Sequence, residues 1–382
     1  MNNHNQDMSP GYNHADVTRQ LLADQSIKVD KTRRRGRAAG LNPSGRYEIQ
    51  SRHGFDDGWE TLEQLEPFKT DVQVERARSV ITRNTSPDIP FDRSINPYRG
   101  CEHGCIYCFA RPSHAHVGLS SGLDFESKLF AKPDAARLLK RELAKDNYIP
   151  KSIAIGTNTD PYQPIERKMR IMRQILEVLA EAKHPIGIVT KSALVLRDID
   201  ILSQMAQDGL VKVALSITTI DRKLARAMEP RASTPTKRLE ALDTLKKAGI
   251  PTSIMIAPVI PGLTDFEIER ILDSAHSVGV EQASYILLRL PREVSPLFRD
   301  WLLRHYPDRY RHVMSLIRSM RGGKDYDAEF GSRMRGNGPY AWQIKRRFEM
   351  TCKRLGLSKR FSTPRTDLFT APEGENTQLK LF

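Results

Sequence analysis

The chain has 382 residues, of which 39% are hydrophobic, so it is long enough to bury a sizeable core in one large domain or two ordinary ones. Its four cysteines are too few for a disulfide framework, and no apolar run suggests a membrane helix or a secretory signal. The formal net charge of +14 favours anionic partners such as nucleic acid. We therefore expect a cytoplasmic protein with no membrane partner.

Residues 1–85 are expected to form a largely disordered N-terminal extension. They are rich in Asn, Gln, Asp, Arg and Gly, and no apolar periodicity persists beyond a few residues. The basic run KTRRRGR at 31–37 lies in this extension and is either a solvated tail or a phosphate-binding surface. The predicted core therefore begins at residue 86.

Between residues 86 and 300, short β-branched runs alternate with longer amphipathic ones. Strands are predicted at 91–98, 151–157, 185–192, 211–218, 251–259 and 283–290. Helices are predicted between them at 133–145, 165–183, 195–209, 234–249 and 265–279. This alternation is typical of βα units around a parallel sheet. We therefore predict an α/β fold, a partial (β/α)6 TIM-like barrel, followed at 301–382 by a mainly helical, basic C-terminal segment.

Polar side chains follow several of the predicted strands at the point where each strand ends. They include Thr157, Asn158, Asp160, Lys191, Ser192 and Ser216. Parallel strands end on the same rim, and in βα barrels that rim carries the chemistry. The candidate site is therefore expected at this rim.

Three of the four cysteines lie within eight residues, just after the first predicted strand. Cys101, Cys105 and Cys108 follow the spacing C-x3-C-x2-C in the stretch CEHGCIYC. A structural zinc ion needs four ligands, so a nearby histidine would have to complete a Cys3His site. Three thiolates can instead hold a [4Fe–4S] cluster and leave one iron open to a small molecule. The cysteines alone leave both kinds of site open.

Tyr107 completes a wider motif around these cysteines. With it, the stretch resembles the C-x3-C-x-aromatic-C motif of the radical S-adenosylmethionine (radical SAM) superfamily, and the resemblance covers roughly residues 88–300. The segment DPYQPIE (160–166) and the residues around the cysteines are most similar to the spore photoproduct lyase and DNA repair photolyase-like branch.

This resemblance implies an enzyme with lyase-like or other radical chemistry. Cys101, Cys105 and Cys108 would be its metal ligands and catalytic residues, because they would hold a [4Fe–4S] cluster. The cluster would reductively cleave S-adenosyl-L-methionine (SAM) to a 5′-deoxyadenosyl radical, which abstracts a hydrogen atom from an unidentified substrate. An electron donor such as flavodoxin or ferredoxin is implied as a partner.

The resemblance also implies a set of contacts to SAM. Many members of the superfamily carry a Gly-Gly-Glu motif after the second strand, which accepts hydrogen bonds from the amino group of SAM. This chain reads GTNTD there, so Thr157, Asn158 and Asp160 are the expected acceptors. The departure from the motif changes which side chains make this contact.

The remaining SAM contacts are expected on later strand ends. Lys191, together with Ser192, would bind the methionine carboxylate through charge-assisted hydrogen bonds. Ser216 and Arg231 fall near the usual ribose and carboxylate contacts, and Tyr107 would lie near the adenine.

Two functions follow from these patterns. The first is a radical SAM enzyme whose substrate could be a nucleic acid, because residues 331–360 hold nine Lys or Arg against a single Glu. The alternative is a non-catalytic, zinc-stabilised Cys3His protein that binds nucleic acid. Cys352, in an expected amphipathic helix outside the barrel, is predicted to be a buried structural thiol.

Overall fold

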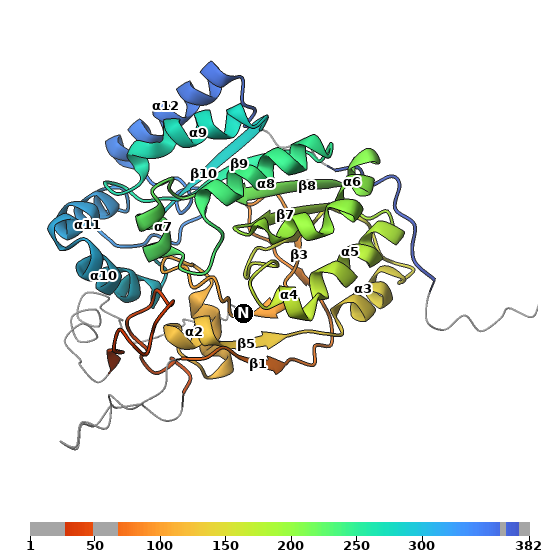
Figure 1. Ribbon diagram of the computed structural model, residues 1–382, viewed down its shortest axis with the longest axis horizontal. Helices are drawn as coiled ribbons and strands as arrows, with labels where there is room; N and C mark the ends of the chain where they lie inside the picture. Colours follow the sequence, from red (N-terminus) through yellow and green to blue (C-terminus); the bar gives the residue numbers. More distant parts are fainter. Residues whose placement is uncertain (1–26, 49–67, 360–363, 374–382) are drawn as a thin grey trace, which may run out of the picture.

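The computed structural model describes residues 27–48, 68–359 and 364–373. Its centre is a seven-stranded sheet with the strand order β10-β9-β8-β7-β6-β3-β2. Six consecutive strands, from β3 to β10, are parallel, and β2 is antiparallel to β3 at one edge. The sheet does not close on itself within the described residues (Figure 1). The predicted partial (β/α)6 barrel is therefore confirmed.

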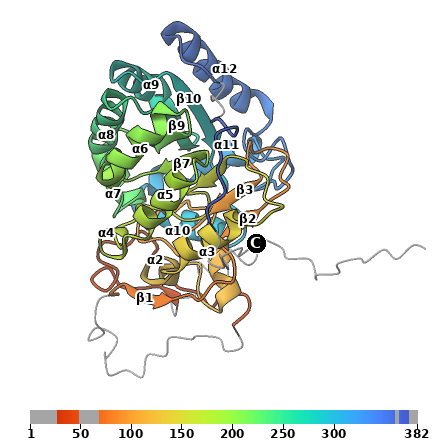
Figure 2. The ribbon, with the colours of Figure 1, turned by 90° about the vertical axis from the view of Figure 1, so that its right-hand side faces the viewer.

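The six parallel strands lie within one residue of the predicted runs or inside them. Their bounds are β3 (Arg93–Ile95), β6 (Ile153–Ile155), β7 (Ile186–Thr190), β8 (Val211–Ser216), β9 (Thr252–Val259) and β10 (Gln282–Leu287). A second sheet, at the opposite end of the molecule from α12, has the order β1-β5-β4 (Figures 1 and 2). The strands outside the parallel array are β1 (Asp71–Val74), β2 (Ile81–Arg83), β4 (Tyr98–Arg99) and β5 (Lys128–Ala131).

Helices and 3-10 turns connect the parallel strands. After β3 these are η3 (Arg111–Val117), α2 (Leu123–Ser127) and α3 (Ala135–Leu143). The later connections are α4 (Glu166–Met169), α5 (Ile171–Glu181), η4 (Ala193–Asp198), α6 (Ile199–Gln207), α7 (Arg222–Met228), α8 (Pro235–Lys247), η5 (Asp265–Glu267) and α9 (Ile268–Ser277). Figures 1 and 2 show α5, α6, α8 and α9 along one face of the sheet.

The helix predicted at 165–183 is split into two. Arg170 adopts a left-handed conformation with φ of 52°, which ends α4. The buried carboxylate of Glu166 then accepts hydrogen bonds from the backbone N–H groups of Ile171 and Met172, each at 3.1 Å. Because these groups open the first turn of α5, the side chain of Glu166 caps a new helix.

The C-terminal segment is mainly helical, as predicted. It contains α10 (Val294–His305), η6 (Pro307–Arg309), α11 (Tyr310–Ser319) and α12 (Gly338–Leu355). Cys352 lies in α12 with 1% of its surface exposed, which confirms the prediction of a buried thiol. None of the described helices combines the length and hydrophobicity that crossing a lipid bilayer requires.

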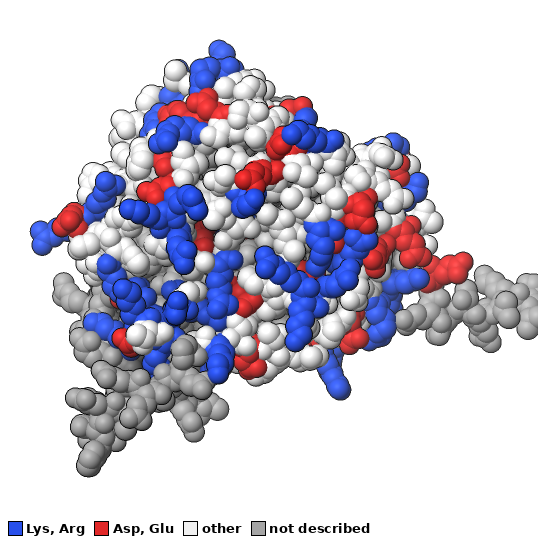
Figure 3. All heavy atoms as spheres, viewed as in Figure 1, with Lys and Arg blue, Asp and Glu red and all other residues white. Residues whose placement is uncertain are grey.

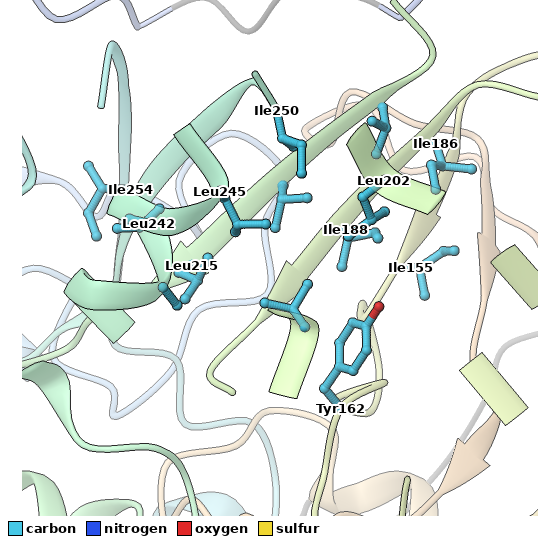
Figure 4. Packing of buried hydrophobic residues seen from close by; sticks show 14 of the residues in the cluster. Ile155, Tyr162, Ile186, Ile188, Leu202, Leu215, Leu242, Leu245, Ile250 and Ile254 are labelled. Carbon is cyan, nitrogen blue, oxygen red and sulfur yellow. The ribbon is translucent and has the colours of Figure 1, made fainter. Parts of the chain in front are cut away.

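The core fills the space between the sheet and its covering helices. Successive side chains of a strand point to opposite faces, so alternate strand residues meet the helices. Figure 4 shows these residues, among them Ile155, Ile188, Leu215 and Ile254 from strands and Leu202, Leu242 and Leu245 from helices. The alternate strand side chains, among them Val189, Ser216 and Met255, point to the opposite side of the sheet. The candidate site lies on that side.

Part of the predicted disordered extension is folded. Ala38, Ala39 and Leu41 are buried in one apolar cluster with the cysteine loop and α10, and β1 and β2 also lie before residue 85. The apolar residues of this extension are too scattered in the sequence to give a periodic pattern. Ala38, Ala39 and Leu41 nevertheless pack on a surface made by the cysteine loop and α10. The other parts of the predicted extension, residues 1–26 and 49–67, lie outside the described residues.

Candidate functional site

A cavity of about 660 Å³ lies where the parallel strands end. Five of the six parallel strands contribute residues to its wall, and β6 contributes through the residues that follow it. The wall includes Ser94 in β3, Asn96 after it, Thr157 after β6, Val189 in β7, Lys191 after it, Ser216 in β8, Met255 and Ala257 in β9, and Ile286 in β10. The cysteine loop forms another part of the wall through Cys105, Tyr107, Cys108 and Phe109. The rim expected from the sequence therefore surrounds one cavity.

The cavity brings together most of the residues that the sequence nominates. Cys105, Tyr107, Cys108, Thr157, Asn158, Lys191 and Ser216 all line it. Cys101, Asp160, Ser192 and Arg231 are not among the lining residues, although the first three lie within two or three residues of one that is. The structure thus separates the nominated residues into a lining group and a supporting group.

Arg111 holds the cysteine loop from behind. This arginine is fully buried, and its guanidinium donates to the backbone carbonyls of Cys105 at 2.9 Å and Gly104 at 3.1 Å. It also forms an ion pair with the buried Glu126 at 2.5 Å. The cost of burying both charges is offset because each also has several backbone hydrogen bonds. Arg111 was missed by the sequence analysis, since an arginine three residues after a cysteine carries no general signal.

Glu126 connects the N-terminal segment to the same loop. Its carboxylate accepts hydrogen bonds from the backbone N–H groups of Ala38 at 3.1 Å and Ala39 at 3.0 Å. Gly104 has φ of 64°, and a β-carbon there would lie 2.7 Å from Oε2 of Glu126. The loop therefore requires glycine at this position for both its conformation and its close approach to Glu126.

Gln163 of the DPYQPIE segment binds the start of the cysteine loop. Its amide oxygen accepts the N–H of Glu102 at 2.8 Å, and its amide nitrogen donates to the carbonyl of Gly100 at 3.3 Å. The backbone N–H of Cys101 donates to the carbonyl of Phe125 at 3.0 Å. Gln163 of the DPYQPIE segment therefore hydrogen-bonds to the backbone of the cysteine loop.

Tyr107 lines the cavity with its ring and directs its hydroxyl away into a buried network. The hydroxyl donates to the carboxylate of Glu229, which also accepts a 2.9 Å hydrogen bond from Thr218 and pairs with the buried Arg238. Burial opposes ionisation of Glu229, but the charges of Arg238 and Lys191 outweigh it and hold the pKa of Glu229 below its usual range. Tyr107 is therefore fixed as a neutral donor to a carboxylate.

Asp160 organises the loop after β7. Its carboxylate accepts hydrogen bonds from the hydroxyl of Thr190 and the backbone N–H of Lys191, both at 2.7 Å, and lies 3.3 Å from Nδ1 of His103. Burial alone would raise the pKa of Asp160, but His103 and these donors lower it to about 2. Asp160 therefore places Lys191 at the cavity, and its own oxygens are already engaged.

Ser192 and Arg231 also have local partners. The hydroxyl of Ser192 accepts the N–H of Leu194 at 3.2 Å and so caps η4. Arg231 donates to the carboxylate of Glu102 at 2.8 Å. These two side chains therefore support the loops beside the cavity.

Asn96 is a cavity residue that the sequence analysis did not nominate. Its amide oxygen accepts the backbone N–H of Asn158 at 2.9 Å and that of Thr159 at 3.3 Å. The chain after β6 is thereby held against the end of β3. The residue opens the stretch NPYRGC, but no spacing rule marks it as a ligand or a support.

The three thiols of the cysteine loop suit a thiolate-bound cluster. Burial raises the pKa of all three, to about 12 for Cys105, so these thiols stay protonated unless a cation takes the place of the proton. A cubane cluster binds each thiolate through a different iron, whereas a zinc ion gathers its ligands on one point. Within the described residues, no three His, Cys, Asp or Glu side chains gather closely enough to hold a single metal ion.

Comparison with known proteins adds a family and a fold. Residues 95–275 match the model of the Radical SAM superfamily. An uncharacterized protein of Mycobacterium tuberculosis is 35% identical over 230 residues, which cover 59% of this chain and 68% of that protein. An uncharacterized protein of Methanocaldococcus jannaschii is 30% identical over 219 residues, which cover 57% of this chain and 78% of that protein. Spore photoproduct lyase in complex with a dinucleoside spore photoproduct shares the fold at 14% identity, with a TM-score of 0.55 over 76% of this chain and 82% of that one.

Proposed function

Because the chain belongs to the radical SAM superfamily and is an enzyme that uses a [4Fe–4S] cluster and SAM, we propose that Cys101, Cys105 and Cys108 hold the cluster. SAM then occupies the adjoining part of the cavity. When bound and reduced, the cluster and SAM together supply the 5′-deoxyadenosyl radical that removes a hydrogen atom from the substrate. The observation that carries this proposal is that two of the cysteines line a cavity at the end of the sheet where the six parallel strands terminate.

The side chains of the cavity have distinct tasks in this proposal. Lys191 binds the methionine carboxylate, and Thr157 with Asn158 accepts hydrogen bonds from the amino group. Ser216 contacts the ribose. Its hydroxyl donates to the carbonyl of Ala257 at 2.9 Å, so its lone pairs remain for a ligand donor. The apolar wall, which includes Val189, Met255, Ala257 and Ile286, excludes water from the reacting atoms.

We propose that the chain has a catalytic core flanked by two supporting parts. Residues 86–300 form the catalytic core, and residues 301–382 form the C-terminal segment. The segment 27–48 and helix α10 share an apolar cluster with Cys105, Ile106 and Tyr107. We therefore expect the catalytic core to need both flanking parts for a stable cysteine loop.

The proposed chemistry is tested by an anaerobic assay. The protein is supplied with iron and sulfide, reduced chemically in place of a flavodoxin or ferredoxin, and mixed with SAM. Formation of 5′-deoxyadenosine by a protein with about four irons per chain is the expected result. A protein that holds one zinc ion and leaves SAM intact would support the Cys3His alternative instead.

Replacing Lys191 by alanine is expected to weaken SAM binding about 10- to 100-fold and to leave the iron content unchanged. The loss of a charge-assisted hydrogen bond to a carboxylate accounts for an effect of this size. Calorimetric titration with SAM measures it, with Lys237→Ala as the control because Lys237 is exposed and pairs with Glu240 away from the cavity. Equal SAM affinity in the two variants would contradict the carboxylate contact.

We propose further that the substrate is a nucleic acid. The cavity is lined by five cationic side chains, Arg99, Lys132, Lys191, Arg289 and Arg333. No Asp or Glu is found among the described residues of its wall, so the potential there favours an anion. The fold that this chain shares with spore photoproduct lyase accommodates a dinucleoside in that enzyme, which is in keeping with a nucleotide substrate.

The basic C-terminal segment is a weaker candidate surface than its composition indicates. Much of its charge is paired, in the ion pairs Arg333–Asp88, Arg347–Glu269, Arg354–Asp273 and Lys359–Glu349. Figure 3 shows Lys and Arg mixed with Asp and Glu on the face that carries α9 and α12. Paired charges attract a polyanion less. Arg99 and Arg333 of the cavity are also paired, but Lys132, Lys191 and Arg289 are not in any ion pair among the described residues and no described Asp or Glu lines the wall, so the cavity is the preferred place for the substrate.

Binding to nucleic acid is expected to depend steeply on salt. Contacts of Lys and Arg with phosphates release counterions, so the logarithm of the binding constant falls with the logarithm of salt concentration by about 0.7 per contact on a single strand. Fluorescence anisotropy with a labelled single-stranded oligonucleotide measures this slope. An absence of binding at low salt would remove nucleic acid as the substrate class.

A further inference from the structure

Arg289 and Phe109 form an unusual pair on the cavity wall. Phe109 directly follows Cys108, and Arg289 lies just beyond β10. The centre of the guanidinium lies 4.9 Å from the centroid of the Phe109 ring, and both residues line the cavity. Phe109 is 45% exposed, which is high for a phenylalanine beside a buried loop. One surface of its ring is thus available to a ligand.

The guanidinium of Arg289 is held in place but keeps unused donors. It donates to the hydroxyl of Tyr326 at 3.2 Å and to the weakly accepting sulfur of Met334 at 3.6 Å. The Tyr326 ring centroid lies 5.9 Å from the centre of the guanidinium, so two aromatic rings lie within 6 Å of this cation. Its Nε is buried and finds no acceptor among the described residues. An unsatisfied buried donor is costly, so an acceptor supplied by a ligand would be bound strongly.

Charge pairing distinguishes Arg289 from the other arginines of the cavity. Arg99 pairs with Glu75 at 2.9 Å, and Arg333 donates to Asp88 at 2.6 Å. Arg289 has no carboxylate within ion-pair distance among the described residues. Lys191, on another wall, is already assigned to the carboxylate of SAM in the proposed function. Arg289 therefore remains as a fixed cation available to a substrate anion.

We propose that Arg289 and Phe109 form the subsite that holds one nucleotide of the substrate beside the cluster, an inference that rests on the proposed function. Arg289 donates to a phosphate, since a guanidinium matches phosphate oxygens in shape and charge. The base stacks on the exposed surface of the Phe109 ring. A base within a duplex has no free surface for such stacking, so the bound nucleotide is unpaired and unstacked.

Three variants of the cluster-loaded protein test this subsite. Arg289→Gln removes the charge, and Phe109→Leu removes the ring while keeping an apolar side chain. Arg335→Gln is the matched control, because Arg335 lies 4.2 Å from the ring centroid of Tyr285 but does not line the cavity. Binding of a fluorescein-labelled tetrathymidylate is measured by anisotropy across a series of salt concentrations. Iron content and the melting temperature confirm that each variant is folded.

The expected result has a magnitude and a salt dependence. Arg289→Gln weakens binding by about tenfold or more and lowers the salt slope by about 0.7, because one phosphate contact is lost. Phe109→Leu weakens binding by about 5- to 100-fold, the usual range for one stacked base, and leaves the salt slope unchanged. Arg335→Gln binds as the native protein does.

Two outcomes would overturn the subsite. One is equal affinity and equal salt slope in Arg289→Gln and Arg335→Gln. The other is no binding of tetrathymidylate by the native protein at low salt. The same native sample is assayed for 5′-deoxyadenosine, so a failure of the subsite is distinguished from a failure of the proposed chemistry.

Discussion

Replacement of Cys105 by alanine is expected to reduce the iron content from about four per chain to nearly none and to abolish formation of 5′-deoxyadenosine. In the proposed site the cluster has three protein ligands, all on one loop, so losing one would leave two irons without a protein thiolate. The loop itself should persist, because Arg111 and Gln163 bind its backbone rather than its sulfurs. Iron analysis, visible absorbance and product assay measure the loss.

Cys352→Ala is the matched control for this change. Cys352 is also buried, but it lies in α12 and is not among the residues that line the cavity. Its removal should cost about 1 kcal/mol of stability, as an ordinary small core substitution does, and should leave the iron content and product yield as in the native protein. If Cys105→Ala retained its iron while Cys352→Ala lost it, the proposed ligand set would be wrong.

Replacement of Arg111 by methionine is expected to destabilise the cluster-free protein by about 3–5 kcal/mol, because it leaves Glu126 buried without its cationic partner. The backbone carbonyls of Gly104 and Cys105 lose their donors at the same time. The loop should then bind the cluster poorly even though all three cysteines remain. Urea unfolding under anaerobic conditions measures the stability, and iron analysis measures the occupancy.

Arg354→Met is the same substitution at a surface ion pair. Arg354 and Asp273 are each about half exposed and pair at 2.7 Å, so losing this pair should cost between 0 and about 1 kcal/mol. Iron content should be unchanged in this variant. Similar stabilities for Arg111→Met and Arg354→Met would show that the network behind the cysteine loop contributes little.

Cys105 and Arg111 have different roles in the same site. The cysteines are the proposed ligands. Arg111 supports them through the loop backbone and through Glu126, which the N-terminal segment also binds. The fold therefore brings residues 38–39 and Glu126 against the loop 101–111, which contains all three proposed ligands. A change in any of the three should affect cluster retention.

The sequence by itself determined the features that are local. The alternation of β-branched and amphipathic runs predicts the six parallel strands, because strand and helix periodicity depend on neighbouring residues. The spacing of Cys101, Cys105 and Cys108 indicates a cluster loop for the same reason, since all its ligands lie within eight residues. Polar strand ends such as Lys191 and Ser216 are placed correctly at the rim, because parallel strands end together.

The tertiary structure decided which polar residues face the cavity and which support it. Asp160 and Arg231 carry charged side chains that could bind a ligand. In the folded chain they instead pair with His103 and Glu102, which come from a distant part of the sequence. The contacts of Arg111, of Tyr107 with Glu229, and of Arg289 with Phe109 likewise join residues that no local pattern relates. Such pairs form only when helices and loops pack over the sheet. The partner of a buried charge is set by proximity in the folded chain and not by spacing along the sequence.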